Sequence, residues 1–301
     1  WVILIRHRSQ TLSSLGVAVL PRSIDSAATI ECIVLNVNLN YEEENMKNLF
    51  DVNGKVAVVT GGSRGIGAMI ARGFVENGVK TYITARREEE LQATVSELAE
   101  IGQCIGIPSD LSTMDGVIAF AAAVSAAEEK VHILVNNAGT TWGADIDVFP
   151  ESGWDKTMDL NVKSLFFLTQ KLLPALRSAS AKDDPARVIN IGSINGLTHP
   201  HMNNYAYSAS KAAVHHLTRH LGADLAPQGV NVNAIAPGFF PSKMTAHLLD
   251  HEAEMGALFP CGRLGNAEDV AGTAIYLSAR ASAWLTGQTI ALDGGAVAAS
   301  G

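Results

Sequence analysis

The chain has 301 residues, of which 47% are hydrophobic and 17% charged, and its formal net charge is -8. This length suits one or two well-buried globular domains, and the acidic balance disfavours a nucleic-acid surface, which needs a basic face. The three scattered cysteines show no CxxC spacing and so indicate neither disulfides nor a metal site, and no apolar run approaches the roughly 20 residues of a membrane span.

Residues 1–45 differ in composition from the rest of the chain, whereas Met46 opens a smooth stretch. We therefore interpret residues 1–45 as a disordered leader or upstream read-through without function, and residues 46–301 as the working domain. A secretory signal fits poorly, because the diluted apolar stretch before Pro21 lacks a clear small-residue cleavage site. On this interpretation the protein is soluble and cytoplasmic.

The alternative for the same segment is a transit peptide. Arg6, Arg8 and Arg22 lie among serines with no acidic residue before Asp25, a pattern typical of such peptides, and the protein would then lie in an organelle matrix. The alternation in Ile30–Leu39 could also form a strand, but the sequence offers it no partner.

From Lys55 onward, short runs rich in β-branched residues alternate with longer helical patterns, which is typical of βαβ units. Several runs are apolar at successive positions, as expected when helices cover both faces of a parallel sheet. The expected strands are Val56–Thr60, Lys80–Thr84, Gln103–Pro108, Val131–Asn136, Arg187–Ile191, Val230–Ile235 and Thr289–Leu292. The expected helices include Ile66–Asn77, Arg87–Ile101, Trp154–Leu176 and Tyr207–Ala226.

This alternation predicts a single α/β domain, a doubly wound Rossmann fold with about seven parallel strands and helices on both faces. We see no linker and no internal repeat after Met46. In such a fold, ligands bind beyond the carboxyl ends of the strands.

A glycine-rich stretch, TGGSRGIG at residues 60–67, joins the first expected strand to the first helix. Glycines there permit a tight turn, close approach of backbone N–H groups to a pyrophosphate and close packing of the helix on the strand. A lone match of this kind is a weak signal and can be a plain loop, but here strand, loop and helix agree. The stretch therefore predicts a dinucleotide site that includes Gly61, Ser63, Arg64, Gly65, Ile66 and Gly67.

The end of the second strand indicates which dinucleotide binds. An NAD site commonly has an acidic residue there for the ribose 2′-hydroxyl, whereas this chain continues Ala85-Arg86-Arg87. Because guanidinium groups match phosphate oxygens, we predict NADP(H), with Arg86 and Arg64 on its 2′-phosphate. The alternative is that these arginines are solvated at helix starts, and Arg87 fits that description best because three glutamates follow it.

Further motifs follow in a familiar order: Asn136-Asn137-Ala138-Gly139, Ser193, Tyr207-Ser208-Ala209-Ser210-Lys211 and Pro237-Gly238. With the glycine-rich stretch, they make the chain resemble the short-chain dehydrogenase/reductase family from Val52 to Gly295. Within that family it looks most similar to the NADPH-dependent 3-oxoacyl reductases, including the rhamnolipid-pathway ketoreductase, through the stretches NNAGTTWG at 136–143 and PARVINIGS at 185–193.

Tyr207 and Lys211 are four residues apart on an expected helix, so their side chains share one face. A free tyrosine has a pKa of about 10, and a nearby ammonium favours the phenolate, so we expect Lys211 to lower the pKa of Tyr207. Tyr207 would donate a proton to the alkoxide that forms when hydride reaches a carbonyl carbon. Taken alone, a buried tyrosine more often only packs.

The resemblance implies further roles. Lys211 would also bond the nicotinamide ribose, Ser193 would hold the carbonyl oxygen beside Tyr207, and Asn161 would support a water-linked proton relay. Ser193 alone would read as a cap or turn residue. By the same resemblance, the other cofactor contacts would be Asp110 and Leu111 at the adenine, Asn137, Ala138 and Gly139 along the ribose and nicotinamide, and Pro237, Gly238 and Phe240 beneath the nicotinamide. The chain departs from the family pattern at Phe240 and Ser242, where the family often has a β-branched aliphatic and a threonine.

Two other groups of residues are weaker candidates. His215, His216 and His220 lie on the helix after Tyr207, and His216 and His220 have the i, i+4 spacing of a metal-binding pair, but the spacing indicates no third ligand. His199 and His201 are best explained as part of a solvated loop. The last group contains apolar residues that could cover a substrate or pack as core: Trp142, Phe240, Met244, Leu248, Leu249, Met255 and Leu258.

These features predict NADPH-dependent reduction of a carbonyl, such as a 3-oxoacyl thioester or another apolar ketone, to a secondary alcohol. The alternative within enzymes is oxidation of a sugar, polyol or steroid alcohol. A non-catalytic NADP(H)-sensing protein on the same fold is a remote alternative. The resemblance implies a homotetramer or homodimer, built partly through the helices that contain Asn161 and Tyr207.

Overall fold

The computed structural model describes residues 2–6, 15–19, 35–37, 46–199, 202–241 and 252–300. The chain divides into two compact units, Trp1–Lys47 and Asn48–Gly301. In the first unit, β1 (Val2–Arg6), β2 (Leu15–Val19) and β3 (Leu35–Val37) pair antiparallel in that order. The strand expected in this region therefore has a partner, β2, that the sequence did not reveal. The interpretation of residues 1–45 as a leader stays a prediction.

The second unit is built on a seven-stranded sheet in the order β10-β9-β8-β7-β4-β5-β6, with every neighbouring pair parallel. The order runs outward from β4 in one direction and from β7 in the other, so the chain reverses its direction of winding between these two strands. The predicted doubly wound α/β fold is thus confirmed. The strands are β4 (Val56–Thr60), β5 (Lys80–Thr84), β6 (Cys104–Gly106), β7 (Ile133–Asn136), β8 (Ala186–Ile191), β9 (Val230–Pro237) and β10 (Thr289–Leu292).

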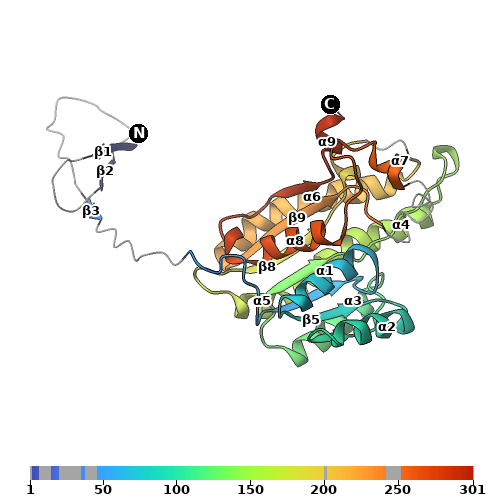
Figure 1. Ribbon diagram of the computed structural model, residues 1–301, viewed down its shortest axis with the longest axis horizontal. Helices are drawn as coiled ribbons and strands as arrows, with labels where there is room; N and C mark the ends of the chain where they lie inside the picture. Colours follow the sequence, from blue (N-terminus) through green and yellow to red (C-terminus); the bar gives the residue numbers. More distant parts are fainter. Residues whose placement is uncertain are drawn as a thin grey trace. The chain divides into compact units, whose positions relative to one another are not determined.

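Helices cover both faces of this sheet (Figure 1). The α-helices are α1 (Gly65–Glu76), α2 (Glu88–Ala99), α3 (Met114–Ala127), α4 (Glu151–Met158), α5 (Ser164–Ala179), α6 (Tyr205–Leu225), α7 (Glu252–Gly256), α8 (Ala267–Ser278) and α9 (Ala296–Ala299). Shorter turns are η1 (Ile146–Val148), η2 (Asp159–Lys163), η3 (Ile194–Gly196), η4 (Ala226–Gln228) and η6 (Arg280–Ser282). None of the helices in the described residues is long and apolar enough to cross a membrane.

The side chains of β4 contribute to two hydrophobic cores, one on each face of the sheet. Ala57 and Val59 point into the core formed with α1, α2 and α8, whereas Val56 and Val58 point into the core formed with α3 and α5. Because successive side chains of a strand face opposite sides, a strand buried on both sides must be apolar throughout. This explains the continuous apolar runs of the sequence.

The helix expected over Trp154–Leu176 is not continuous. It consists of α4 and α5 joined by η2, a π-helical turn in which the backbone N–H of Ser164 bonds to the carbonyl of Asp159. A π turn inserts one extra residue into a helix and shifts the faces that follow it. Such an insertion does not change the polarity of the segment, so the sequence pattern did not show it.

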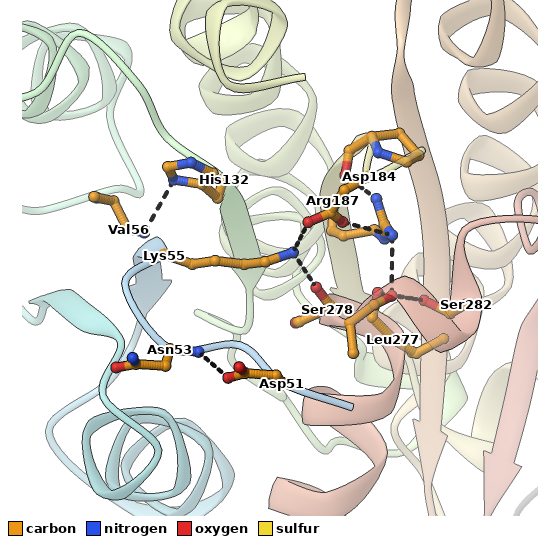
Figure 2. Close-up of polar contacts among 12 residues, drawn as sticks. Asp51, Asn53, Lys55, Val56, His132, Asp184, Arg187, Leu277, Ser278 and Ser282 are labelled. Carbon is orange, nitrogen blue, oxygen red and sulfur yellow. Dashed lines mark hydrogen bonds and ion pairs between the residues drawn. The ribbon is translucent and has the colours of Figure 1, made fainter. Parts of the chain in front are cut away.

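At the amino end of the sheet, Lys55, Asp184 and Arg187 form an ionic cluster that ties β4 and β8 to the end of α8 (Figure 2). The Lys55 Nζ atom lies 2.7 Å from Asp184 Oδ2 and donates to the carbonyl of Ser278 at 3.0 Å. Arg187 is 1% exposed and donates to Asp184 and to the carbonyl of Ala279. We call these three residues the amino-end cluster.

Candidate functional site

A cavity of about 330 Å³ lies at the opposite end of the sheet, beyond the carboxyl ends of the strands on both sides of the β4–β7 reversal. Open parallel sheets bind ligands at this position. Of the predicted site residues, all except Gly67 and Asn161 line the cavity: Gly61, Ser63, Arg64, Gly65, Ile66, Arg86, Asp110, Leu111, Asn137, Ala138, Gly139, Ser193, Tyr207, Lys211, Pro237, Gly238 and Phe240.

Gly67 acts through packing. A Cβ atom at Gly67 would lie 2.3 Å from the carbonyl oxygen of Gly61 and 2.4 Å from Asn137 Nδ2, closer than any real contact. Gly61 and Gly65 have φ angles of 64° and 55°, a region that favours glycine. Together these glycines bring the start of α1 close to β4 and turn its N-terminus toward the cavity.

The side chain of Asn137 holds the glycine-rich stretch in place. Its Nδ2 atom donates to the carbonyls of Thr60 and Gly61 at 2.8 and 3.1 Å. The Thr60 hydroxyl accepts from the backbone N–H groups of Asn137 and Ala138, both at 2.9 Å. The ends of β4 and β7 are therefore joined at the floor of the cavity.

Three arginines and two carboxylates are among the residues that line the cavity: Arg64, Arg86, Arg87, Glu90 and Asp110. Arg64 Nη1 lies 3.2 Å from one carboxylate oxygen of Glu90, and Arg87 Nη1 lies 2.8 Å from the other. The pairing of Arg87 with a following glutamate was expected, whereas the pairing of Arg64 was not. Burial raises the pKa of Asp110, but hydrogen bonds from Ser112 and the charge of Arg86 outweigh it, so this carboxyl titrates below its usual value.

Tyr207, Ser193 and Lys211 meet at another part of the cavity lining. Tyr207 forms a side-chain hydrogen bond with Ser193, and Lys211 Nζ lies 5.5 Å from the centre of the Tyr207 ring. Lys211 Nζ also donates to the carbonyl of Ile191, the last residue of β8, at 2.7 Å. The fold therefore brings the three residues together as expected.

The pKa shifts differ from the expectation at Tyr207. Burial raises the pKa of the phenol, and the hydrogen bond with Ser193 opposes this, so the net effect is an increase rather than the decrease expected from Lys211. Burial also lowers the pKa of Lys211 to about 8, so its amine loses a proton only slightly above neutral pH. Desolvation thus sets the direction of both pKa shifts.

His215 supports the turn that carries Ser193. It is 5% exposed, and its Nε2 atom accepts from the backbone N–H of Ser193 at 3.4 Å. A Cβ atom at Gly192 would lie 2.1 Å from this nitrogen, and one at Gly196 would lie 2.9 Å from His215 Cε1. The turn therefore rests directly on the imidazole.

Asn161 lies in the π-helical turn η2 and is 2% exposed. Its Oδ1 atom accepts from the backbone N–H of Thr140 at 2.8 Å, and its Nδ2 atom donates to the Thr140 carbonyl and to Ser210 Oγ, both at 2.9 Å. Its side chain joins the segment after Gly139 to α6. Irregular π turns occur often at functional sites.

The weaker candidates have other surroundings. Trp142 packs on Gly153 of α4, and Leu258 is 72% exposed. Phe240 lines the cavity at 3% exposure, with its ring against Gly265. Several other candidates lie outside the described residues: His201, Ser242, Met244, Leu248 and Leu249.

The histidines of α6 have separate surroundings. His220 lies 3.5 Å from Asp224, and His215 is buried against the turn at Ser193. No group of three or more potential metal ligands occurs within the residues that the structure describes.

Sequence reasoning missed several residues at the strand ends. A scan of every residue just beyond a predicted strand would have found most of them, because parallel strands bring these positions together. Glu90 differs, because only the tertiary contact with Arg64 reveals it. The missed lining residues are Thr84, Ala85, Glu90, Ser109, Leu160, Ile191 and Gly192, and Arg87 lines the cavity as well.

The glycine-rich turn, the cavity and the Tyr207–Lys211 pair agree with a comparison to known families. The short chain dehydrogenase family model matches residues 55–253. The chain belongs to this family. It is 46% identical over 253 residues to the rhamnolipids biosynthesis 3-oxoacyl-[acyl-carrier-protein] reductase of Pseudomonas aeruginosa, which covers 83% of the chain and 99% of the relative.

Solved structures of family members superpose on the chain. The Pseudomonas aeruginosa RhlG/NADP active-site complex is 45% identical, with a TM-score of 0.80 and coverage of 84% of this chain and 100% of that one. A gluconate 5-dehydrogenase from Burkholderia cenocepacia J2315 in complex with NADP and tartrate is 30% identical, with a TM-score of 0.76 and coverage of 83% and 98%. These relatives are named as reductases or dehydrogenases, and the chain is an oxidoreductase of their family.

Proposed function

We propose that the protein reduces a carbonyl compound to a secondary alcohol with NADPH, and that its substrate is a 3-oxoacyl thioester or another apolar ketone. The observation that carries this proposal is the Tyr207–Ser193 pair, which lies with Lys211 in the same cavity as the arginines near Glu90. A proton donor for the substrate oxygen and a cationic site for a phosphate thus occur within one cavity.

The residues of the cavity fit NADP(H). A Cβ atom at Gly61 would lie 2.9 Å from Asn137 Nδ2, so only a glycine leaves the backbone open at this turn. The first turn of α1 contains no acidic residue, and its N–H groups and dipole favour a pyrophosphate. Arg64 and Arg86 would hold the 2′-phosphate, and Pro237, Gly238 and Phe240 would border the nicotinamide. When bound, NADPH supplies the hydride.

The remaining chemistry belongs to the side chains. Ser193 and Tyr207 would bind the carbonyl oxygen, and Tyr207 would donate its proton to that oxygen as it becomes an alkoxide. The raised pKa of Tyr207 keeps the phenol protonated at neutral pH, which suits a proton donor. Lys211, fixed on the carbonyl of Ile191, would return a proton to the tyrosine, and Asn161 holds the backbone of Thr140 beside this path.

The relatives support the cofactor and the substrate class. The similar Pseudomonas protein is named as a 3-oxoacyl reductase, and the similar solved structure is an NADP complex. The buried apolar residues Leu160 and Phe240, which line the same cavity as Tyr207 and Ser193, suit an apolar substrate. Assembly into a homodimer or homotetramer stays a prediction from the family resemblance.

Oxidation of a sugar acid is the second candidate, because gluconate 5-dehydrogenases are also similar to the chain. Rates with 3-oxoacyl thioesters, small ketones and gluconate, each with NADP(H) and NAD(H), separate the two candidates. We expect the highest kcat/KM with a 3-oxoacyl thioester and NADPH. A preference for gluconate and NAD would overturn the main proposal.

The Tyr207→Phe variant tests the proton donor. We expect kcat to fall by about 10³ or more, because the general acid is lost, whereas the dissociation constant of NADPH changes less than about twofold. Stopped-flow rates and fluorescence titration of NADPH measure the two effects. The Tyr205→Phe variant is the matched control, since Tyr205 is 38% exposed and its ring meets Phe149 edge to face. A Tyr207→Phe variant with more than a tenth of the normal kcat would exclude Tyr207 as the acid.

A further inference from the structure

The carboxylate of Glu90 lies among the arginines at the end of the cavity where the 2′-phosphate is proposed to bind. Its two oxygens are divided between two partners, Arg64 at 3.2 Å and Arg87 at 2.8 Å. Glu90 and all three arginines line the cavity. The Glu90 side chain is 28% exposed, against 49% for Arg64 and 73% for Arg87.

The helix that carries Glu90 is fastened to the glycine-rich stretch. Thr94 Oγ1 lies 3.1 Å from the carbonyl oxygen of Glu90 and 3.0 Å from that of Ser63, so the two carbonyls share its single hydroxyl hydrogen. The first turns of α2 are therefore held beside the loop residue that precedes Arg64. This contact keeps the carboxylate within reach of the Arg64 guanidinium.

Arg86 differs from the other two arginines. Among the described residues it has no ion pair, and its charge lowers the pKa of Asp110. A 2′-phosphate would meet Arg86 without displacing a carboxylate, but it can reach the guanidinium groups of Arg64 and Arg87 only by sharing them with Glu90 or replacing it. Two anions on one guanidinium repel each other, which weakens the binding of both.

We propose that Glu90 is a specificity-determining residue that competes with the 2′-phosphate of the cofactor for Arg64 and Arg87. Glu90 therefore weakens the binding of NADP(H). It also reduces the enzyme's preference for NADP(H) over NAD(H), because NAD(H) has no 2′-phosphate with which Glu90 could compete. This inference rests on the proposed function only in taking NADP(H) as the cofactor. Because the arginines are half-exposed or more, solvent screens the competition, and the effect is moderate.

The test compares two nucleotides that differ only in the 2′-phosphate, adenosine 2′,5′-bisphosphate and adenosine 5′-monophosphate, by isothermal titration calorimetry at low ionic strength. The variant is Glu90→Gln, since glutamine suits the third position of a helix as well as glutamate does. We expect it to bind the bisphosphate about three- to tenfold more tightly and to bind the monophosphate within about twofold of normal. Added salt should reduce the gain.

Glu89→Gln is the matched control. It removes the same charge from the neighbouring residue of α2, which is exposed and has no ion pair within the described part of the chain. We expect Glu89→Gln to leave the ratio of the two affinities within about twofold. An equal gain in both variants would show a general charge effect and overturn the proposal.

Two further results would overturn it in different ways. Weaker binding of the bisphosphate by Glu90→Gln would mean that Glu90 positions the arginines for the phosphate instead of competing with it. If the wild-type enzyme binds both nucleotides equally, the NADP(H) assignment itself fails, and this inference fails with it. A normal bisphosphate preference that Glu90→Gln leaves unchanged would refute only the role of Glu90.

Discussion

Two lysines lie at opposite ends of the seven-stranded sheet, and both are largely buried. Lys211 at the carboxyl end is 5% exposed, and the side chain of Lys55 at the amino end is 11% exposed. Both donate to a main-chain carbonyl: Lys211 to that of Ile191, and Lys55 to that of Ser278. The difference is that Lys55 also has the carboxylate of Asp184 at 2.7 Å.

The carboxylate changes what burial does to each lysine. Burial lowers the pKa of Lys55, and the hydrogen bond and charge of Asp184 oppose this decrease without cancelling it. Burial lowers the pKa of Lys211 to about 8. A buried lysine with an acid partner stabilises the fold as a lasting ion pair, whereas one without such a partner is poised to exchange protons. The contrast separates a structural end of the sheet from a reactive one.

The largest expected effect is a separation of activity from stability in two matched variants. Lys211→Met should lower kcat by about 10³ or more, while its free energy of unfolding stays equal or rises because a buried ammonium is removed. Lys55→Met should keep normal kcat per folded molecule but lose about 1–3 kcal/mol of its free energy of unfolding, because Asp184 and the carbonyl of Ser278 lose a partner. Urea unfolding and NADPH oxidation on the same preparations measure both. Equal losses of activity in the two variants would break the comparison.

A second prediction concerns alkaline pH in the cofactor-free protein. The pKa of Lys211 is about 8 when folded and 10.5 ordinarily, so between these values the unfolded chain binds more protons, and stability rises with pH. Below about pH 8 the folded state carries the whole cost of the buried charge. The stability advantage of Lys211→Met over the wild type should therefore shrink by up to about 3 kcal/mol between about pH 7.5 and about pH 10. A constant advantage would show that Lys211 keeps its ordinary pKa.

The smallest expected effect is on the pH dependence of stability, and it concerns His132 at the amino end of the sheet. Burial, and then the charge of Lys55, lowers the pKa of His132, whose Nδ1 atom accepts from the backbone N–H of Val56 at 3.1 Å. Below about pH 6.5 the unfolded chain binds more protons than the folded one, so this contribution to stability is lost as pH falls. His132→Asn keeps an acceptor that does not titrate.

We expect the wild type to lose about 0.5–1 kcal/mol more than His132→Asn between about pH 7 and about pH 5. Denaturant unfolding at the two pH values measures the loss. Turnover at neutral pH should be the same in both proteins, because His132 lies at the structural end. If the stability of the wild type and of His132→Asn changed identically with pH, the lowered pKa of His132 would be contradicted.

The sheet could be predicted well because its strands are short apolar runs with clear ends. The bounds of Val56–Thr60, Lys80–Thr84 and Thr289–Leu292 agree with the structure, since turn residues flank each run. Other bounds shift by one or two residues, where hydrogen bonding rather than composition ends the strand. The π turn was missed because one extra backbone residue leaves no trace in side-chain polarity.

The site could be predicted where function depends on residue type and short spacing, as for Tyr207 and Lys211. It could not be predicted where long-range contacts decide. Glu90 meets Arg64 across 26 residues, and Lys55 meets Asp184 across 129. The direction of the pKa shift at Tyr207 also depends on burial, which spacing alone does not reveal.

The imidazole of His215 beneath the Ser193 turn sets limits for protein engineering. Side chains added at Gly192 or Gly196 would collide with this ring, and the collision at Gly196 also involves the backbone of Lys211 at 2.6 Å. Leu197, by contrast, is 43% exposed. A mutant library aimed at new substrates should therefore keep both glycines and place its diversity at Leu197 and beyond. A smaller residue in place of His215 would relieve the collision at Gly192 only, because backbone atoms block Gly196.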